Sequence, residues 1–340
     1  MTNVMTNRGA TARPDLRGRT ILLYAPRFFG YDRRIEQRLS AWGAQVRHLP
    51  DTPTSFGFRA RRMVGGSALD SFVRQFWRNQ LRSVKQEPID LVLIINGGVL
   101  GGEFVSELRA SHPEARVVSY QWDSLSRSHR QSLVDASDRA FSFDRLDCEA
   151  QPRLTYLPLF YLPEYAVGEA RQLDFDLLFV GTDHGDRYEI VRKVRRQFGS
   201  QGLSMETHLY KNAIGVARAV VASRGLIRPS EFTLSTLPAQ AVLGLVLRSR
   251  AVLDIHNPNQ SGLTMRTFEA LAAGRKLVTT NSAVIHEPFY DPEWIHVIDR
   301  GDPVIDVGFV RGIPSTPIKE RMAPHSLDRW LSSMLMEMTS

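Results

Sequence analysis

The sequence has little cysteine, no long apolar run and no excess of acidic residues. Its one cysteine, Cys148, excludes a disulfide within the chain and a metal site built from several cysteines. No segment reaches the ~20 consecutive apolar residues that span a bilayer. The nearest candidate, 213–227, is interrupted by Arg218 and Arg224. Residues 1–18 are polar and basic, lack the apolar centre of a secretory signal, and are predicted to form a disordered tail. We therefore expect a cytoplasmic protein.

The chain is instead rich in positive charge. Its 43 Lys and Arg residues exceed its 36 Asp and Glu residues, which gives a formal net charge of +7 and a sequence pI of about 9.7. Such an excess indicates an anionic partner: a nucleotide, a phosphate group, nucleic acid or acidic lipid headgroups. No recognised nucleic-acid-binding module accompanies the charge, so we expect no nucleic acid partner.

Short apolar runs recur along the chain, separated by turn-forming residues and helical patterns. They predict strands at 20–25, 45–49, 90–96, 116–120, 140–143, 154–157, 175–180, 206–210, 251–255, 276–280 and 294–298. Strands that alternate with helices, in a chain long enough for two ordinary domains, predict two doubly wound parallel sheets. We expect Rossmann-like domains at 19–168 and 169–324 facing one cleft, a linker near 168–172 and a closing helix at 325–340.

The segment from Leu253 to Asn281, LDIHNPNQSGLTMRTFEALAAGRKLVTTN, carries the most specific pattern in the chain. It predicts a strand, a polar turn, a helix that begins near Leu263 and a second strand. A loop that leads to a helix N-terminus at the carboxyl end of a parallel strand is suited to hold phosphate. Arg266 could pair with a diphosphate, and Glu269 could accept hydrogen bonds from ribose hydroxyls. The alternative is a solvated Arg–Glu pair on an ordinary helix.

Two further loops follow predicted strands. In GTDHGDR, Gly181 allows close backbone approach and Arg187 could reach a phosphate, although Asp186 could simply cap the next helix. The loop NGGVLGG, 96–102, lacks the spacing of a dinucleotide-binding loop, so we expect no nicotinamide cofactor. The metal-binding residue types near these loops match no standard ligand pattern: Asp183, His184, Asp254 and His256. We expect no metal site, with diphosphate-bound Mg²⁺ as the exception that we retain.

Two aspartates of the first domain follow predicted strands and are candidates for acid–base work. Asp123 stands beside Trp122 in YQWDS, where partial desolvation can raise the pKa of a carboxylate. Asp32 stands in FGYDRR. Either residue could take a proton from an acceptor hydroxyl. The alternatives are that Asp32 begins a helix and that Asp123 caps one.

The segment 69–84 predicts an amphipathic helix. Apolar residues including Phe72, Phe76 and Trp77 recur at i, i+3 and i+4, and arginines follow every fourth position on another face. A basic amphipathic helix can lie on an anionic membrane surface. The alternative is that the apolar stripe packs on its own sheet, while the arginines here and at 59–62 face lipid headgroups or a polyprenyl diphosphate.

Several segments, in this order, resemble a known family: FFGYDRRIEQRL, YQWDS, FSFDRLD, LPLFY, DLLFVGTDHGDRY and LDIHNPNQSGLTMRTFEALAAGRKLVTTN. The resemblance covers roughly residues 20–306. The family that these segments resemble comprises the glycosyltransferase-like proteins of bacterial capsule, O-antigen and lipopolysaccharide gene clusters. These proteins are distantly similar to the spore-maturation CgeB group. The resemblance implies a GT-B glycosyltransferase, with the nucleotide-sugar donor on the second domain and the acceptor on the first.

By this resemblance, the helix in GLTMRTFEALAAG binds the donor, and Glu269 holds the ribose. Many retaining relatives have a second glutamate eight residues earlier. Ser261 stands there in this chain, which leaves the stereochemical outcome open. The predicted donor-binding residues are Gly181, Thr182, His184, Arg187, His256, Gln260, Ser261, Gly262, Leu263, Thr264, Arg266 and Glu269. Asp123 or Asp32 would be the base of an inverting reaction.

We therefore expect a glycosyltransferase that takes a nucleotide-sugar as substrate, has no tightly bound cofactor and does not require Mg²⁺. Its acceptor would be a lipid-linked saccharide or polysaccharide, and the enzyme would work at the cytoplasmic face of the membrane. Two alternatives stay open. One is a nucleotide-sugar 2-epimerase on the same architecture, and the other is a non-catalytic glycan-binding or assembly protein.

Overall fold

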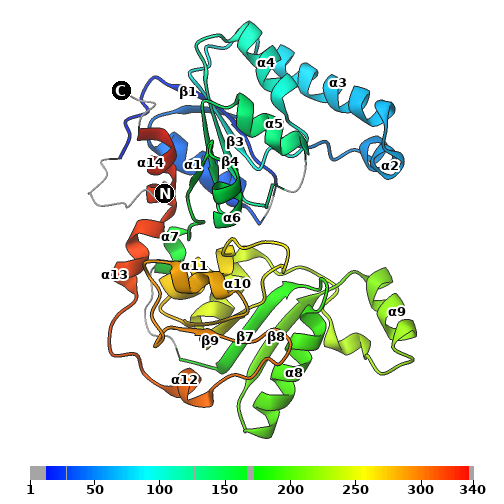
Figure 1. The fold of residues 1–340 in the computed structure, drawn as a ribbon, viewed down its shortest axis with the longest axis vertical. Coiled ribbons are helices and arrows are strands. Elements are labelled where there is room, and N and C mark those ends of the chain that lie inside the picture. Colours follow the sequence, from blue (N-terminus) through cyan, green and yellow to red (C-terminus); the bar gives the residue numbers. More distant parts are fainter. Residues whose placement is uncertain (1–12, 28, 126–127, 167–171, 337–340) are drawn as a thin grey trace. The chain divides into compact units, whose positions relative to one another are not determined.

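The computed structural model describes residues 13–27, 29–125, 128–166 and 172–336. The chain divides into two compact units. Unit 1 comprises Met1–Leu159 and Leu327–Ser340, and unit 2 comprises Phe160–Ser326. Each unit has its own parallel sheet with helices between the strands, so the predicted class of two Rossmann-like α/β domains is confirmed (Figure 1).

Unit 1 has a six-stranded sheet in the order β2-β1-β3-β4-β5-β6, and neighbouring strands pair in parallel. The strands are β1 (Thr20–Tyr24), β2 (Gln45–Leu49), β3 (Leu91–Ile95), β4 (Arg116–Gln121), β5 (Arg139–Ser142) and β6 (Leu154–Tyr156). All six lie within two residues of the predicted runs; the inner strands β1, β3 and β4 are buried and largely apolar, whereas the edge strand β2 (QVRHL) is partly exposed. The chain leaves β1 toward β2 on one side and later toward β3 on the other, so the strand order reverses between β1 and β3.

Helices cover both faces of the unit 1 sheet (Figure 1). They are α1 (Tyr31–Ala41), α2 (Phe56–Val64), α3 (Ser67–Val84), α4 (Gly102–Ser111), α5 (Ser128–Ala136), α6 (Arg145–Ala150) and α14 (Leu327–Leu335). On one face, Trp77 of α3 and Phe104 of α4 join the core built on Leu22 and Val92. On the other face, Trp330 of α14 meets the ring of Tyr120 edge to face, with 4.7 Å between ring centroids. The predicted closing helix is therefore part of unit 1.

Unit 2 has a five-stranded parallel sheet in the order β11-β10-β9-β7-β8. Its strands are β7 (Phe175–Thr182), β8 (Met205–Tyr210), β9 (Ser249–Asp254), β10 (Lys276–Thr279) and β11 (Ile295–Val297). The chain passes from β7 to β8 on one side and then to β9 on the other, so the strand order reverses between β7 and β9. Ligands of open α/β sheets bind at the carboxyl ends of the strands at such a point.

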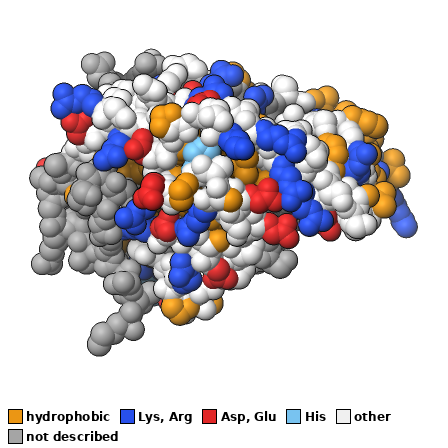
Figure 2. Space-filling view, turned by 90° about the horizontal axis from the view of Figure 1, so that it is seen from above, with side chains coloured by type: hydrophobic (Ala, Val, Ile, Leu, Met, Phe, Trp, Pro, Cys, Tyr) orange, Lys and Arg blue, Asp and Glu red, His pale blue; other side chains and the backbone are white. Residues whose placement is uncertain are grey.

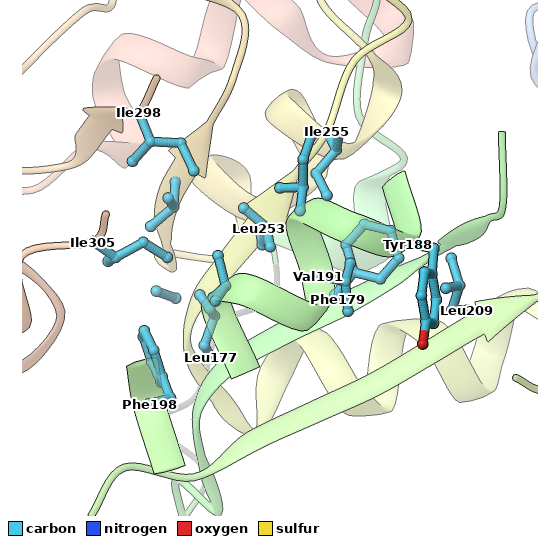
Figure 3. Packing of buried hydrophobic residues seen from close by; sticks show 14 of the residues in the cluster. Leu177, Phe179, Tyr188, Val191, Phe198, Leu209, Leu253, Ile255, Ile298 and Ile305 are labelled. Carbon is cyan, nitrogen blue, oxygen red and sulfur yellow. The ribbon is translucent and has the colours of Figure 1, made fainter. Parts of the chain in front are cut away.

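The helices of unit 2 are mostly short. They are α7 (Pro163–Ala166), α8 (Arg187–Ser200), α9 (Ala213–Ala222), α10 (Ala239–Leu247), α11 (Met265–Ala272), α12 (Val307–Arg311), α13 (Lys319–Met322), and the 3₁₀ helices η1 (Pro229–Glu231), η2 (Ser282–His286) and η3 (Ala323–His325). Figure 3 shows the core on one face of the sheet, where Val191 and Phe198 of α8 pack on Leu177 and Leu253. Alternate strand residues point to the opposite face, which α10 and α11 cover.

The structure refines the expected organisation at the N-terminus and at the boundary between the units, and it decides between the two interpretations of the amphipathic helix. Of the predicted disordered tail 1–18, residues 1–12 lie outside the described residues, while Leu16 is buried and its N–H donates to the carbonyl of Trp42 over 3.0 Å. The units divide after Leu159, whereas the predicted linker at 168–172 lies almost wholly outside the described residues. The amphipathic helix is α3, and its C-terminal half packs on the sheet of unit 1. No helix in the described part of the chain is both long and apolar enough to cross a membrane.

Candidate functional site

The segment that follows β9 is anchored to its own strand by one aspartate. Asp254 is the last residue of β9 and is 6% exposed. Its Oδ2 accepts hydrogen bonds from the hydroxyls of Thr264 (2.9 Å) and Thr267 (3.1 Å). Thr264 is also the N-cap of α11, where its side chain accepts from the N–H of Arg266. Asp254 thus fixes the N-terminus of α11 at the carboxyl end of the central strand.

Two arginines hold the backbone of the loop at the end of β9. Arg187 donates to the carbonyls of Ile255 (2.9 Å) and Thr182 (3.0 Å), which joins the ends of β9 and β7. Arg300 donates to the carbonyl of His256 (3.0 Å) and forms a bidentate pair with Asp186 (2.6 and 2.7 Å). Burial lowers the pKa of Arg187, but a guanidinium still carries its charge at neutral pH. The point where the strand order reverses therefore carries two fixed guanidinium groups, of which Arg300 is paired with Asp186 and Arg187 lies near Asp254.

Side chains from the end of β10 complete the loop. Asn281, which is 4% exposed, donates to the carbonyls of Ser261 (3.1 Å) and Gly262 (3.2 Å). The hydroxyl of Thr280 lies 2.8 Å from Nδ1 of His256. Burial lowers the pKa of His256, which favours a neutral imidazole. The loop 255–264 is thus held at both ends by neighbouring strands.

Arg266 and Glu269 form an ion pair, but not the solvated pair that the alternative interpretation predicted. Arg266 Nη1 and Glu269 Oε2 are 2.7 Å apart, and the glutamate side chain is 3% exposed. Tyr165 of α7 packs against both residues and forms hydrogen bonds with them, and burial raises its pKa. Oε2 of Glu269 is therefore already bonded within the protein, and a ribose hydroxyl can replace Arg266 at this oxygen only if Arg266 gives up the contact.

The loop after β7 also differs from its expected geometry. Asp186 occupies the N-cap position of α8, but its side chain makes no capping bond and pairs with Arg300 instead. Asp183 Oδ2 lies 2.5 Å from Nζ of Lys211, while His184 is exposed. Within the described residues, no group of three or more His, Cys, Asp or Glu side chains is placed to hold a metal ion.

The two candidate bases of unit 1 lie in different surroundings. Asp123 follows β4 and its side chain is 47% exposed; Oδ2 accepts from Nδ2 of Asn96 (3.0 Å) and lies 3.4 Å from Arg130. Asp32 is 5% exposed and lies in the first turn of α1, so it begins a helix, as the alternative predicted.

Sequence reasoning missed four residues that shape the unit 2 site. Asp254 was considered only as a metal ligand, and Tyr165, Asn281 and Arg300 were not singled out. The only local signal for Asn281 is the polar TTNS segment directly after a buried strand. Arg300 stands 114 residues after its partner Asp186, so its role depends on the fold of the whole unit.

No family model and no curated protein sequence matches the chain. Solved structures do match. A glycosyltransferase from Rickettsia africae has 10% identity and a TM-score of 0.62 over 94% of this chain and 97% of its own. An alpha,alpha-trehalose-phosphate synthase (UDP-forming) from Burkholderia vietnamiensis has 11% identity and a TM-score of 0.60 over 94% and 99%. A UDP-GlcNAc 2-epimerase from Methanocaldococcus jannaschii, solved with UDP-GlcNAc and UDP, has 8% identity and a TM-score of 0.56 over 94% and 99%.

At these identities the likeness concerns the fold. It extends over nearly the full length of both chains, so both Rossmann-like units are included. The predicted GT-B-like fold class is therefore confirmed.

Proposed function

We propose that this chain is a glycosyltransferase that moves a sugar from a nucleotide-sugar to a lipid-linked saccharide in cell-surface polysaccharide biosynthesis. The observation that carries the proposal is the arrangement at the carboxyl ends of β7 and β9. There the loop 255–264 leads into the N-terminus of α11, and Arg187 and Arg300 hold its backbone. Backbone N–H groups and positive charge at a helix N-terminus suit the diphosphate of a nucleotide.

In the proposed donor complex, Arg266 changes partners. The diphosphate would draw its guanidinium away from Glu269, and the carboxylate would then accept hydrogen bonds from the ribose hydroxyls. Arg266 would exchange Glu269 for the diphosphate, and Glu269 would exchange Arg266 for ribose hydroxyls. Neither charge is then buried without a hydrogen-bonding partner. The movement requires a new rotamer of Arg266, whose side chain is 19% exposed, and the loss of its contact with Tyr165.

The same cationic groups would serve catalysis. Negative charge grows on the diphosphate as the bond to the sugar breaks, and Arg187, Arg266 and the amides at the start of α11 are placed to stabilise it. A metal ion is not needed for this role, although Mg²⁺ can accompany the diphosphate. Asp123 is the proposed base for the acceptor hydroxyl, and Asp32 is the second candidate.

The need for an acceptor distinguishes the proposed transferase from a nucleotide-sugar 2-epimerase. The fold is shared with a UDP-GlcNAc 2-epimerase, which motivates the alternative that the chain isomerises a nucleotide-sugar. The test incubates a panel of nucleotide-sugars with the protein, with and without a bacterial lipid extract, and follows free nucleoside diphosphate and the sugar by NMR. A transferase releases nucleoside diphosphate only when acceptor is present, whereas an epimerase converts the donor alone.

Asp123→Asn sharpens this assay. The substitution keeps the shape of the side chain and removes its basicity, so we expect unchanged donor affinity and turnover lower by about two to four orders of magnitude. Retained turnover would remove Asp123 as the base. If the wild-type protein binds a donor but turns over none with or without acceptor, the non-catalytic glycan-binding function replaces the proposal.

A further inference from the structure

Helix α2 is unusual in what it exposes. Phe56, Met63 and Val64 are 84%, 89% and 88% exposed, although each is apolar. The helix FGFRARRMV also carries three arginines and no acidic residue. Figure 2 shows hydrophobic and basic side chains next to one another toward the right, the side on which α2 and α3 lie in Figure 1. A surface of this kind is suited to an anionic partner with an apolar part.

A cavity of about 580 Å³ lies against this helix. The loop 52–54 after β2 lines one side, and Phe58, Arg59, Arg62 and Met63 of α2 line the other. Phe58 is 5% exposed and stacks on Phe72 of α3 with 6.3 Å between ring centroids, so the apolar wall is fixed. The cavity therefore combines a rigid apolar side with two exposed guanidinium groups.

Helical geometry separates the third arginine from this cavity. Arg59, Arg62 and Met63 are related by i, i+3 and i+4, so they project from neighbouring positions. Arg61 lies about 100° around the helix from Arg62. Its Nη1 donates to the carbonyl of Gly57 (3.1 Å), and its guanidinium lies 4.9 Å from the centre of the Phe72 ring. Arg59 and Arg62 are not among the arginines that form ion pairs in the described part of the chain.

We infer that this cavity binds the phosphate end of the lipid-linked acceptor, with the phosphate on Arg59 and Arg62 and the first part of the lipid chain along Phe58 and Met63. The inference rests on the proposed function, because it names the acceptor subsite of that reaction. Arginine is suited to phosphate because its planar donors can bind two oxygens at once. A phosphate without an apolar chain would leave Phe58 and Met63 without a partner. An apolar chain without a phosphate would leave Arg59 and Arg62 without one.

The test measures binding of farnesyl diphosphate, a soluble molecule with both parts, to the full-length protein in the absence of a donor. We expect Arg59→Gln and Arg62→Gln each to weaken binding about tenfold, the effect of losing one charge-assisted contact to phosphate. Arg61→Gln is the matched control, because it removes the same charge from the same helix outside the cavity. It should change affinity less than about twofold. Equal losses in all three variants would overturn the inference.

Two further ligands distinguish the sources of an anionic signal. Inorganic diphosphate that binds as tightly as farnesyl diphosphate would reveal a simple anion site and overturn the inference. In a second arm, phosphatidylcholine vesicles containing a polyprenyl phosphate are compared with vesicles of equal charge containing phosphatidylglycerol. The inference is supported if the wild-type protein prefers vesicles with polyprenyl phosphate and Arg59→Gln abolishes this preference. Equal binding to both kinds of vesicle would indicate attraction to any anionic surface and would overturn the inference.

The result is independent of the donor site. Among the residues that the structure describes, those lining the cavity lie between 52 and 63, and the nucleotide site is proposed in unit 2. Nucleoside diphosphate binding in Arg59→Gln and Arg62→Gln should equal that of the wild-type protein. Loss of lipid binding with intact nucleotide binding supports the inference, and loss of both in variants that remain folded would overturn it. Arg59→Lys and Arg62→Lys keep the charge but lose the bidentate donors, so they should recover only part of the affinity.

Discussion

At the carboxyl end of the unit 2 sheet, the buried polar side chains around α11 are bonded to one another, and Oδ1 of Asp183 after β7 is an atom without a hydrogen-bond partner in the described structure. Asp254 accepts from two threonine hydroxyls, Glu269 pairs with Arg266, and Asn281 holds two loop carbonyls. At the same end of the unit 1 sheet, four adjacent strands leave buried polar atoms without a hydrogen-bond partner in the described structure. They are the hydroxyl of Tyr24, Oδ2 of Asp51, Oδ1 of Asn96 and both amide atoms of Gln121.

The two sites differ in whether their buried polar atoms have hydrogen-bond partners within the protein. A buried polar atom without a partner costs about 1–3 kcal/mol, so such atoms persist where water or a ligand completes them. Unit 2 holds its loop in place before any ligand binds, as a preorganised diphosphate site requires. Unit 1 has several such atoms at the end of its sheet, where water or a ligand would satisfy them, and the proposed acceptor side lies in this unit.

The largest effect should come from breaking the bonded pair in unit 2. Glu269→Ala removes the partner of Arg266, whose side chain is mostly buried, and should lower the free energy of unfolding of unit 2 by about 3–5 kcal/mol. Native-state hydrogen exchange of α11 measures this change. The double variant Arg266→Met, Glu269→Leu should recover most of the loss, since it leaves no lone charge. A double variant as unstable as Glu269→Ala would show that the pair is not the cause.

A buried histidine of unit 2 should make this unit sensitive to acid. His325 packs against the rings of Phe268 and Phe289, and burial lowers its pKa to about 4. The folded pKa lies below the unfolded one, so stability is complete above pH ~6.5 and falls by roughly 3.5 kcal/mol as the pH drops to ~4. Hydrogen exchange of unit 2 against pH should show this fall, and His325→Phe should flatten it. An unchanged slope in the variant would contradict the assignment.

Unit 1 should show a dependence of opposite sign. Burial raises the pKa of Asp51 to about 6, with Arg130 and His48 opposing the shift. The folded state therefore holds the proton more tightly, and stability falls by up to about 3 kcal/mol as the pH rises from ~4 to ~6 and stays low above that. Asp51→Asn should stabilise unit 1 at pH 7.5 and leave it unchanged near pH 4. Equal effects at both values would refute the role of the buried charge.

The strands of both units were predictable because buried parallel strands require continuous apolar runs. The loop and helix after β9 were also predictable, since turn residues, spacing and the glycine stop are local. The i, i+3 spacing predicted the Arg266–Glu269 contact but not its burial, which depends on Tyr165 about 100 residues earlier.

Other features leave no local trace. In the sequence, an aspartate at a strand end does not reveal whether it faces water or accepts hydrogen bonds within the protein. The hydrogen bonds from Thr264 and Thr267 to Asp254 could therefore not be predicted. The pattern at 69–84 predicted an amphipathic helix but left open whether its apolar stripe contacts a membrane or packs on its own sheet. In the structure, the C-terminal half of α3 is buried on the unit 1 sheet, and apolar residues of α2 are exposed. The choice between membrane contact and packing for the stripe of α3 depends on this tertiary contact, which the local sequence does not show.

The most direct test of the account is hydrogen exchange of the full-length protein with a panel of nucleoside diphosphates, with and without Mg²⁺. A ligand at ~100 times its Kd should stabilise the fold by ~2.7 kcal/mol. We predict that one nucleoside diphosphate protects residues 255–266 and the first turn of α8 selectively, with or without Mg²⁺. Protection by none of the panel, or protection confined to unit 1, would contradict a donor site at the carboxyl ends of β7 and β9.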